Sequence, residues 1–232
     1  MNDAYDDDVY ELIADTARPA AEVIVPLVLE QVRPRSVIDY GCGTGDWLAV
    51  FVEHGVQEVL GVDGTWLDQR HLKIARQDFR VHDLREPFTP GRGFDLAICL
   101  EVAGHIPPAQ EGVFLDSLAA LAPVLLFSAP IPRQPGIGDQ PLNNRWPSYW
   151  AKGLGERGFV AIDCLRARLW EDRRVLWWYA QNMWLAVLES ALDELPQLRR
   201  TYEAGPRAPL PLVHPGMVEE LLVDLGAGAD QE

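Results

Sequence analysis

Three glycines at alternate positions, Gly41, Gly43 and Gly45, directly follow an apolar run over residues 36–40. Glycine lets the backbone turn sharply and approach a ligand closely, and a helix that begins after such a turn offers free N–H groups. Asp63 closes the next apolar run, where a carboxylate can accept hydrogen bonds from both hydroxyls of a ribose. This combination predicts a nucleotide-like ligand, and a plain strand-to-helix turn is the alternative that the glycines alone leave open.

Two features of a dinucleotide site are missing from this segment. The G-x-G-x-x-G spacing requires glycine at position 46, where the chain has Asp46. A carboxylate at the start of the helix would also repel a pyrophosphate. The charge therefore favours a cofactor that lacks phosphate and carries a cation.

These residues need a scaffold of alternating strands and helices. Helical spacing is found between several short apolar runs, for example over residues 46–54 and 110–121, and a further short helix is expected over residues 148–157. Such alternation indicates one α/β domain with a Rossmann-like, mostly parallel seven-stranded sheet, helices on both faces and ligands at the carboxyl edge. The strands are expected at residues 36–40, 58–62, 76–81, 94–99, 124–128, 159–165 and 175–184.

Both ends of the chain flank this domain. The first segment is acidic and continues into a helix over residues 13–32, with Pro19 expected at its first turn and Pro26 at a kink. The last segment is rich in proline and is expected to form a tail packed on the domain. The expected divisions are 1–35 for the N-terminal segment and helix, 36–202 for the domain and 203–232 for the tail.

The 232-residue chain carries 20 Lys and Arg against 35 Asp and Glu, a net charge of −15. That field repels phosphate backbones and anionic lipids, so we expect neither a nucleic acid nor a membrane as partner. Cys42, Cys99 and Cys164 include no CxxC pair, which predicts neither a disulfide framework nor a metal site. The acidic N-terminus lacks the basic and apolar regions of a secretory signal, and we expect a cytoplasmic protein.

The segment over residues 39–45, Asp-Tyr-Gly-Cys-Gly-Thr-Gly, resembles the signature loop of class I S-adenosylmethionine-dependent methyltransferases. The resemblance continues in the same order through residues 61–64, 82–84 and 94–102, and it covers about residues 36–130. It implies a Rossmann-like methyltransferase that binds S-adenosylmethionine and releases S-adenosylhomocysteine.

The resemblance also implies roles for individual residues. The glycine turn would hold the methionine end of the cofactor with Asp39 near its amino group, Asp63 would bind the ribose, and Asp83 would bind the adenine amino group. Leu84 would pack near the adenine, and Leu100 with Glu101 would line the far side of the cofactor. The expected cofactor-binding residues are Asp39, Gly41, Cys42, Gly43, Gly45, Trp47, Asp63, Gly64, Asp83, Leu84, Leu100 and Glu101.

Residues 145–150, Arg-Trp-Pro-Ser-Tyr-Trp, are similar to a loop of a small bacterial subgroup of these enzymes, often thought to act on sugars or specialised metabolites. The subgroup has Glu-His after the fourth strand, where this chain has Gly104 and His105. It also has a His before an Asn-Glu-Gln-Trp run, and this chain lacks that His. These departures lie where the acceptor is expected, so its identity stays open. The expected substrate-binding residues are Asn143, Asn144, Trp146 and Tyr149, with turn-forming asparagines and packing aromatics as the alternatives.

A hydroxyl acceptor must lose its proton, and a His or a carboxylate usually takes it. His105 follows the fourth expected strand, where such folds place reacting groups. Asp139, in the loop before residues 145–150, is the second candidate for a catalytic base. A hydrogen-bonded loop histidine and a solvated loop acid are the alternatives.

The sequence thus predicts methyl transfer to a small polar metabolite, with a hydroxyl oxygen of a sugar or natural product as the preferred acceptor. No Asn/Asp-Pro-Pro-Tyr/Phe motif follows the fourth expected strand, which argues against a DNA base. The alternatives are a non-methylating reaction of the same cofactor, such as a cyclisation, and a protein that binds the cofactor without catalysis. A nicotinamide-dependent enzyme ranks below both.

Overall fold

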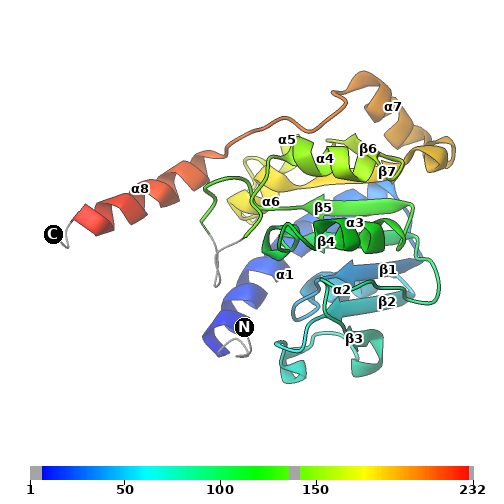
Figure 1. Ribbon diagram of the computed structural model, residues 1–232, viewed down its shortest axis with the longest axis horizontal. Helices are drawn as coiled ribbons and strands as arrows, with labels where there is room; N and C mark the ends of the chain where they lie inside the picture. The colour runs from blue at the N-terminus through cyan, green and yellow to red at the C-terminus, as the bar shows by residue number, and fades with distance from the viewer. Residues whose placement is uncertain (1–6, 136–141, 230–232) are drawn as a thin grey trace.

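A seven-stranded sheet forms the centre of the computed structural model, which describes residues 7–135 and 142–229 (Figure 1). The strand order is β3-β2-β1-β4-β5-β7-β6, and β7 is antiparallel to both of its neighbours while the other pairs are parallel. The expected mostly parallel seven-stranded sheet is therefore confirmed. The strands are β1 (Ser36–Tyr40), β2 (Glu58–Asp63), β3 (Phe79–Val81), β4 (Leu96–Leu100), β5 (Val124–Ser128), β6 (Phe159–Ile162) and β7 (Trp184–Leu188).

Helices cover both faces of this sheet and divide the core into two apolar layers. Residues of α1, α2, α5 and α6 pack against one face, and residues of α3 and α4 pack against the other. Figure 1 shows α3 and α4 in front of the sheet. The helices are α1 (Asp7–Gln31), α2 (Asp46–Glu53), α3 (Glu111–Ala119), α4 (Pro147–Gly155), α5 (Arg166–Leu169), α6 (Trp177–Asn182), α7 (Pro196–Ala204) and α8 (Pro215–Ala229).

The first helix is longer than expected. It begins at Asp7, so Pro19 and Pro26 both lie inside α1, and the expectation of Pro19 at the first turn is wrong. A proline inside a helix removes one backbone hydrogen bond. Close packing against the sheet compensates for this loss, because Ala20, Ala21 and other apolar residues of α1 are completely buried. Tertiary burial thus overrides a local helix-breaking signal.

The expected strand over residues 175–184 is also wrong. Residues 177–182 form α6, and β7 begins only at Trp184. The aromatic run favoured a strand because large aromatic side chains suit a pleated surface. In the structure, the helical turn instead buries Tyr179 and Ala180 in the core layer under α1 and brings two amide side chains to the same region.

Two other strands are shorter than expected. Residues 76–78 form a 3₁₀ turn, so β3 contains only Phe79–Val81, and β6 ends at Ile162 rather than at residue 165. The helices expected over residues 110–121 and 148–157 are confirmed as α3 and α4 with slightly different ends.

Three neighbouring strands bring their carboxyl ends together. Asp39 of β1 pairs with Gly61 of β2 on one side and with Ile98 of β4 on the other. The residues that follow β1 and β4, and the last residue of β2, therefore meet at one edge of the sheet, which lies at the left in Figure 1. Ligands of open α/β sheets bind at this edge.

One buried arginine, Arg166, attaches the C-terminal part of the chain to the domain. The Arg166 guanidinium donates to the carbonyl oxygens of Leu210 at 2.8 Å and Gln181 at 3.2 Å, and it forms an ion pair with Asp163. Beyond residue 214, α8 contacts α6, and Trp177 Nε1 donates a hydrogen bond of 2.9 Å to Glu220. The rest of α8 extends away from the sheet (Figure 1).

Replacing Arg166 by Met is expected to destabilise the fold by about 3–5 kcal/mol, since the Asp163 carboxylate and two carbonyl groups lose their donor. Replacing Arg174 by Met removes an ion pair with Asp172. Because the Arg174 side chain is 71% exposed, this replacement should lower the free energy of unfolding by no more than about 1 kcal/mol. Urea unfolding followed by tryptophan fluorescence measures both values. Equal losses in the two variants would contradict the anchoring role of Arg166.

Candidate active site

Three carboxylates from three neighbouring strands lie at the carboxyl edge of the sheet. Asp39 is the next-to-last residue of β1, Asp63 ends β2, and Glu101 directly follows β4. Burial and the nearby charge of Asp63 raise the pKa of Asp39 well above its ordinary value. Among the described residues, neither Asp63 nor Glu101 forms an ion pair with Lys or Arg. The edge therefore suits a ligand that brings its own positive charge.

The glycine turn lies against this edge in a conformation that only glycine adopts readily. The φ angles of Gly41, Gly43 and Gly45 are 101°, 49° and 84°. A Cβ atom on Gly41 would lie 2.3 Å from Cγ2 of Val102, so the turn packs directly against the residue after Glu101. The backbone N–H of Gly41 donates to the Val62 carbonyl at 2.8 Å, which ties the turn to β2.

Asp63 is held by donors from this turn. Its Oδ2 accepts a hydrogen bond of 2.7 Å from the Gly43 backbone, and its Oδ1 accepts one of 2.7 Å from the Gly64 backbone. Trp66 donates a third hydrogen bond from its side chain. Burial raises the pKa of Asp63, and these hydrogen bonds oppose the rise. The indole ring of Trp66 also covers Gly64, because a Cβ atom there would lie 2.1 Å from the ring.

The start of α2 places the remaining residues of the turn. Gly45 is the N-cap, Asp46 opens the helix, and the Thr44 hydroxyl donates to the Asp46 carboxylate. The Cys42 thiol is buried against Gly61, and burial raises its pKa well above the ordinary value. Trp47 is buried edge-on to Tyr179, with 5.3 Å between the ring centroids.

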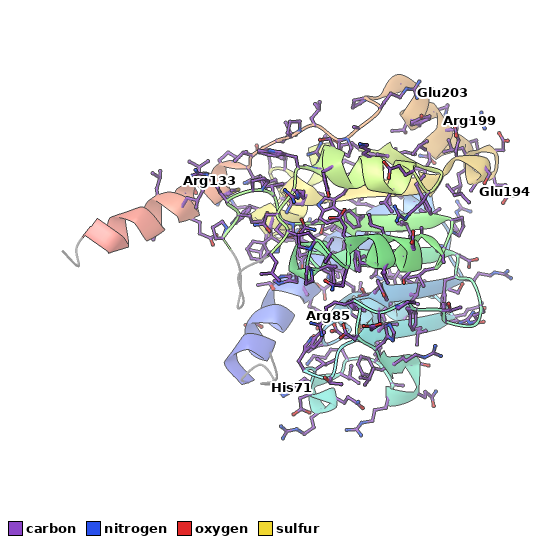
Figure 2. All side chains as sticks on the ribbon, in the orientation of Figure 1. His71, Arg85, Arg133, Glu194, Arg199 and Glu203 are labelled. Carbon is purple, nitrogen blue, oxygen red and sulfur yellow. The ribbon has the colours of Figure 1, made fainter. Side chains whose placement is uncertain are left out.

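Asp83, expected at the adenine, is bound by an arginine of its own loop. Its carboxylate accepts hydrogen bonds from Arg85 Nε at 2.8 Å and from Arg85 Nη2 at 2.6 Å, which lower the pKa of Asp83. Figure 2 shows Arg85 near the ends of β1 and β2. Leu84 is buried beside this pair, and its carbonyl accepts a hydrogen bond from the Tyr40 hydroxyl at 3.5 Å. The adenine roles of Asp83 and Leu84 stay predictions.

Glu101 forms hydrogen bonds with two side chains that sequence reasoning missed. Its carboxylate accepts a hydrogen bond of 2.8 Å from Gln134 Nε2 and one of 3.1 Å from Asn182 Nδ2, and Asn182 also donates to Gln134 Oε1 at 2.8 Å. Burial raises the pKa of Glu101 to about 6, although these hydrogen bonds oppose the rise. Asn182 was hidden in the residues expected as a strand, and Gln134 stands alone in a proline-rich loop with no recognisable pattern.

A further amide extends this network toward the C-terminal part of the chain. Gln181 Nε2 donates to Asn182 Oδ1 at 3.0 Å, and Gln181 Oε1 accepts a hydrogen bond of 2.7 Å from the His214 backbone. Gln134, Gln181 and Asn182 are all buried. The segment before α8 therefore helps to fix the side chains that hold Glu101.

The structure describes one of the two residues expected to act as a base. His105 ends a short 3₁₀ turn after β4 and is exposed. Its neighbour Gly104 is packed so closely that a Cβ atom would lie 2.3 Å from Pro130. Asp139 lies outside the described residues. The catalytic roles of His105 and Asp139 therefore stay predictions.

Two of the four residues expected to bind substrate form hydrogen bonds with another carboxylate, Glu111 of α3. Asn143 is buried and donates to Glu111 at 2.8 Å, and the Tyr149 hydroxyl donates to Glu111 at 2.9 Å. Asn144 Oδ1 is buried and has no hydrogen-bond partner among the described residues. Trp146 is 39% exposed. Asn143 and Tyr149 are thus hydrogen-bonded to Glu111, whereas Asn144 has a buried carbonyl oxygen without a described partner and Trp146 has exposed aromatic surface.

Residues 7–135 and 142–229 contain no group of three or more His, Cys, Asp or Glu side chains arranged to hold a metal. No helix within these ranges has the length and apolar character needed to cross a bilayer.

Residues 12–183 match the profile of a protein family described as a methyltransferase domain. The chain belongs to this methyltransferase family. The match runs from α1 to the residue before β7 and includes every element that carries the glycine turn and the three carboxylates. The chain is therefore a methyltransferase of the S-adenosylmethionine-dependent kind, and its family implies S-adenosylmethionine as the cofactor. No curated protein sequence matches it.

Enzymes whose solved structures share this fold are named for different acceptors. A sugar N-methyltransferase from Streptoalloteichus matches with a TM-score of 0.56 and 20% identity, over 73% of this chain and 86% of that chain. An amino pentose methyltransferase from Micromonospora echinaspora, solved with S-adenosylmethionine bound, matches with a TM-score of 0.54 and 16% identity, over 74% and 91% of the two chains. A small RNA methyltransferase matches with a TM-score of 0.53 and 14% identity, over 74% of this chain and 25% of that chain. The fold alone therefore does not identify the acceptor.

The raised pKa of Glu101 predicts a pH-dependent contribution to the stability of the methyltransferase. Because the folded pKa of about 6 exceeds the ordinary 4.5, the contribution is present below pH 4.5 and is lost as the pH rises through 6. Relative to wild type, Glu101→Gln should therefore become more stable between pH 4.5 and pH 8 by up to about 2 kcal/mol. Urea unfolding at both pH values measures this difference, and a constant difference would contradict the prediction.

Proposed function

We propose that this methyltransferase binds S-adenosylmethionine at the carboxyl ends of β1, β2 and β4 and methylates a small polar metabolite. The preferred acceptor is a hydroxyl oxygen of a sugar or natural product. The observation that carries the proposal is the glycine turn beside Asp39, Asp63 and Glu101, three carboxylates without a basic partner in the described ion pairs. When bound, the cofactor supplies an electrophilic methyl group on a positively charged sulfur.

The geometry of the turn fits such a ligand. Gly41, Gly43 and Gly45 have positive φ angles and carry no side chains, so a ligand can approach the backbone of the turn closely. The Asp63 carboxylate accepts three hydrogen bonds, and a carboxylate has about four acceptor positions, so capacity remains for a ribose hydroxyl. A cofactor with sulfonium and ammonium groups would also favour the ionised form of Asp39.

The acceptor side is supported by the loop that follows residue 141. The backbone N–H groups of Leu142 and Asn143 both donate to the Gly104 carbonyl at 2.8 Å, which holds this loop next to the end of β4. The buried Asn144 Oδ1 without a described partner suits a polar acceptor, and the exposed face of Trp146 suits a sugar ring. Asn143 and Tyr149 would then shape the loop through Glu111.

An amine acceptor is the second candidate. The sugar N-methyltransferase and the amino pentose methyltransferase share this fold, and an ammonium group would suit the same negative edge. A nucleic acid acceptor is disfavoured because the net charge of −15 repels phosphates, although a small RNA methyltransferase also shares the fold.

Isothermal titration calorimetry tests the cofactor site. Wild type should bind S-adenosylmethionine and S-adenosylhomocysteine with micromolar affinity, about −8 kcal/mol, and should not bind NAD. Asp63→Asn should weaken both sulfur ligands by about tenfold or more, because a charge-assisted hydrogen bond to the ribose is lost. Asp68→Asn is the matched control, since Asp68 lies on the same loop but pairs with Arg70, and its affinities should stay within about threefold.

If neither S-adenosylmethionine nor S-adenosylhomocysteine binds, the proposed cofactor is refuted. Equal affinities of wild type and Asp63→Asn would instead refute the ribose role of Asp63 alone.

An acceptor panel tests the substrate class. The methyltransferase is incubated with S-adenosylmethionine and one of three classes of acceptor, which are neutral sugars or glycosides, amino sugars, and a short RNA. Mass spectrometry follows the formation of S-adenosylhomocysteine and of methylated products. We expect methylated neutral sugars or glycosides, and a turnover with Asp63→Asn at least tenfold lower at limiting cofactor because it binds the cofactor less tightly. Methylated amino sugars alone would select the second candidate, and a methylated RNA would contradict the small-molecule proposal.

A further inference from the structure

Glu101 has the most unusual backbone and hydrogen-bonding environment in the site. Among the described residues, Glu101 and Arg133 are the non-glycine residues with positive φ angles, 60° and 68°. Arg133 directly precedes Gln134, which donates to the Glu101 carboxylate at 2.8 Å. Both left-handed residues therefore flank one hydrogen bond, and Figure 2 shows Arg133 on the side of the molecule from which α8 extends. Backbone strain of this kind persists where the surroundings hold a functional side chain in place.

The donors that hold Glu101 are neutral. Gln134 and Asn182 are amides, so they orient the carboxylate without compensating its charge. Two other carboxylates show the contrast, because Asp83 and Asp163 are each bound by a guanidinium group. A carboxylate paired with arginine is a weak base, whereas one held by amides in a buried site keeps its affinity for a proton. In agreement, burial raises the pKa of Glu101 to about 6.

The position of Glu101 links it to the cofactor side of the edge. Val102, the next residue, contacts Gly41 at the start of the glycine turn. Cys99 on β4 and Tyr179 on α6 are titratable neighbours of Glu101. Burial raises the pKa of both groups, and the charges of Asp39 on β1 and of Glu101 add to the rise. Neither neighbour is basic, so among the described residues a proton or a cation is a suitable partner for the Glu101 carboxylate.

We propose that Glu101 is a catalytic residue that accepts the proton of the methyl acceptor, with Gln134 and Asn182 as positioning residues; this inference rests on the proposed function. The acceptor oxygen forms its bond to the methyl carbon as the carbon–sulfur bond breaks and its electron pair passes to sulfur. The acceptor's proton passes to the Glu101 carboxylate and is later released to water. Glu101 thus replaces His105 and Asp139 as the base and adds a role to its expected one beside the cofactor.

Binding of two cofactor analogues tests this role without a known acceptor. Sinefungin carries an ammonium group on carbon where S-adenosylmethionine carries its sulfonium methyl, and S-adenosylhomocysteine has only a neutral sulfur there. A carboxylate that faces the transfer position should favour sinefungin. We expect Glu101→Gln to lower the ratio of sinefungin affinity to S-adenosylhomocysteine affinity at least tenfold in calorimetry at pH 8, with S-adenosylhomocysteine affinity changed less than threefold. Glu86→Gln, which removes an exposed carboxylate from the loop after β3, should leave the ratio unchanged.

A pH series of wild type gives the same information without a variant. The preference for sinefungin should fall as the pH drops through about 6, because protonated Glu101 no longer attracts the ammonium group. Asn182→Leu should shift this midpoint to higher pH, since one hydrogen bond to the ionised carboxylate is lost, and a merely structural role would leave the midpoint unmoved.

The possible failures are distinguishable. If wild type binds neither analogue, the proposed cofactor site is wrong and the role of Glu101 falls with it. If both analogues bind but their affinity ratio is independent of pH and of Glu101→Gln, the cofactor site stands and the catalytic role of Glu101 is overturned.

Discussion

The structure depends on the parallel pairing of β1 with β2 and β4, which brings three carboxylates and one glycine turn to a single edge. Burial raises the pKa of Asp39, and the like charge of Asp63 adds to the rise. Backbone N–H groups of the turn and amide side chains from distant segments stabilise Asp63 and Glu101. A cationic ligand would complete this balance, which connects the fold to methyl transfer from a sulfonium.

The second half of the chain serves this edge in two ways. The antiparallel insertion of β7 between β5 and β6 brings the preceding helix α6, and with it Asn182, next to the end of β4. Arg166 and Gln181 then hold the segment before α8 against α6. The carboxylate at the end of β4 is therefore supported by residues that belong to neither the glycine turn nor the strands beside it.

Other methyltransferases share this fold but differ in the acceptors that their names give. The fold is shared by enzymes described as acting on sugars and on RNA, and the cofactor edge is built from the strands at the centre of the sheet. In the proposed function, the acceptor side would be built from loops and from α6, where this chain has Gly104, Asn144 and the Glu101 network. Specificity therefore depends on the parts that the fold does not determine.

The sequence by itself determined the alternation of strands and helices, the glycine turn and the position of Asp63 at the end of β2, because local apolar runs and glycine conformations encode them. Only the tertiary structure decided the partners of Glu101. Gln134 and Asn182 lie 33 and 81 residues away from it, and contacts over such distances follow from packing rather than from local pattern. The same packing made residues 177–182 a helix, since burial of one helical face outweighed the strand preference of its aromatic residues.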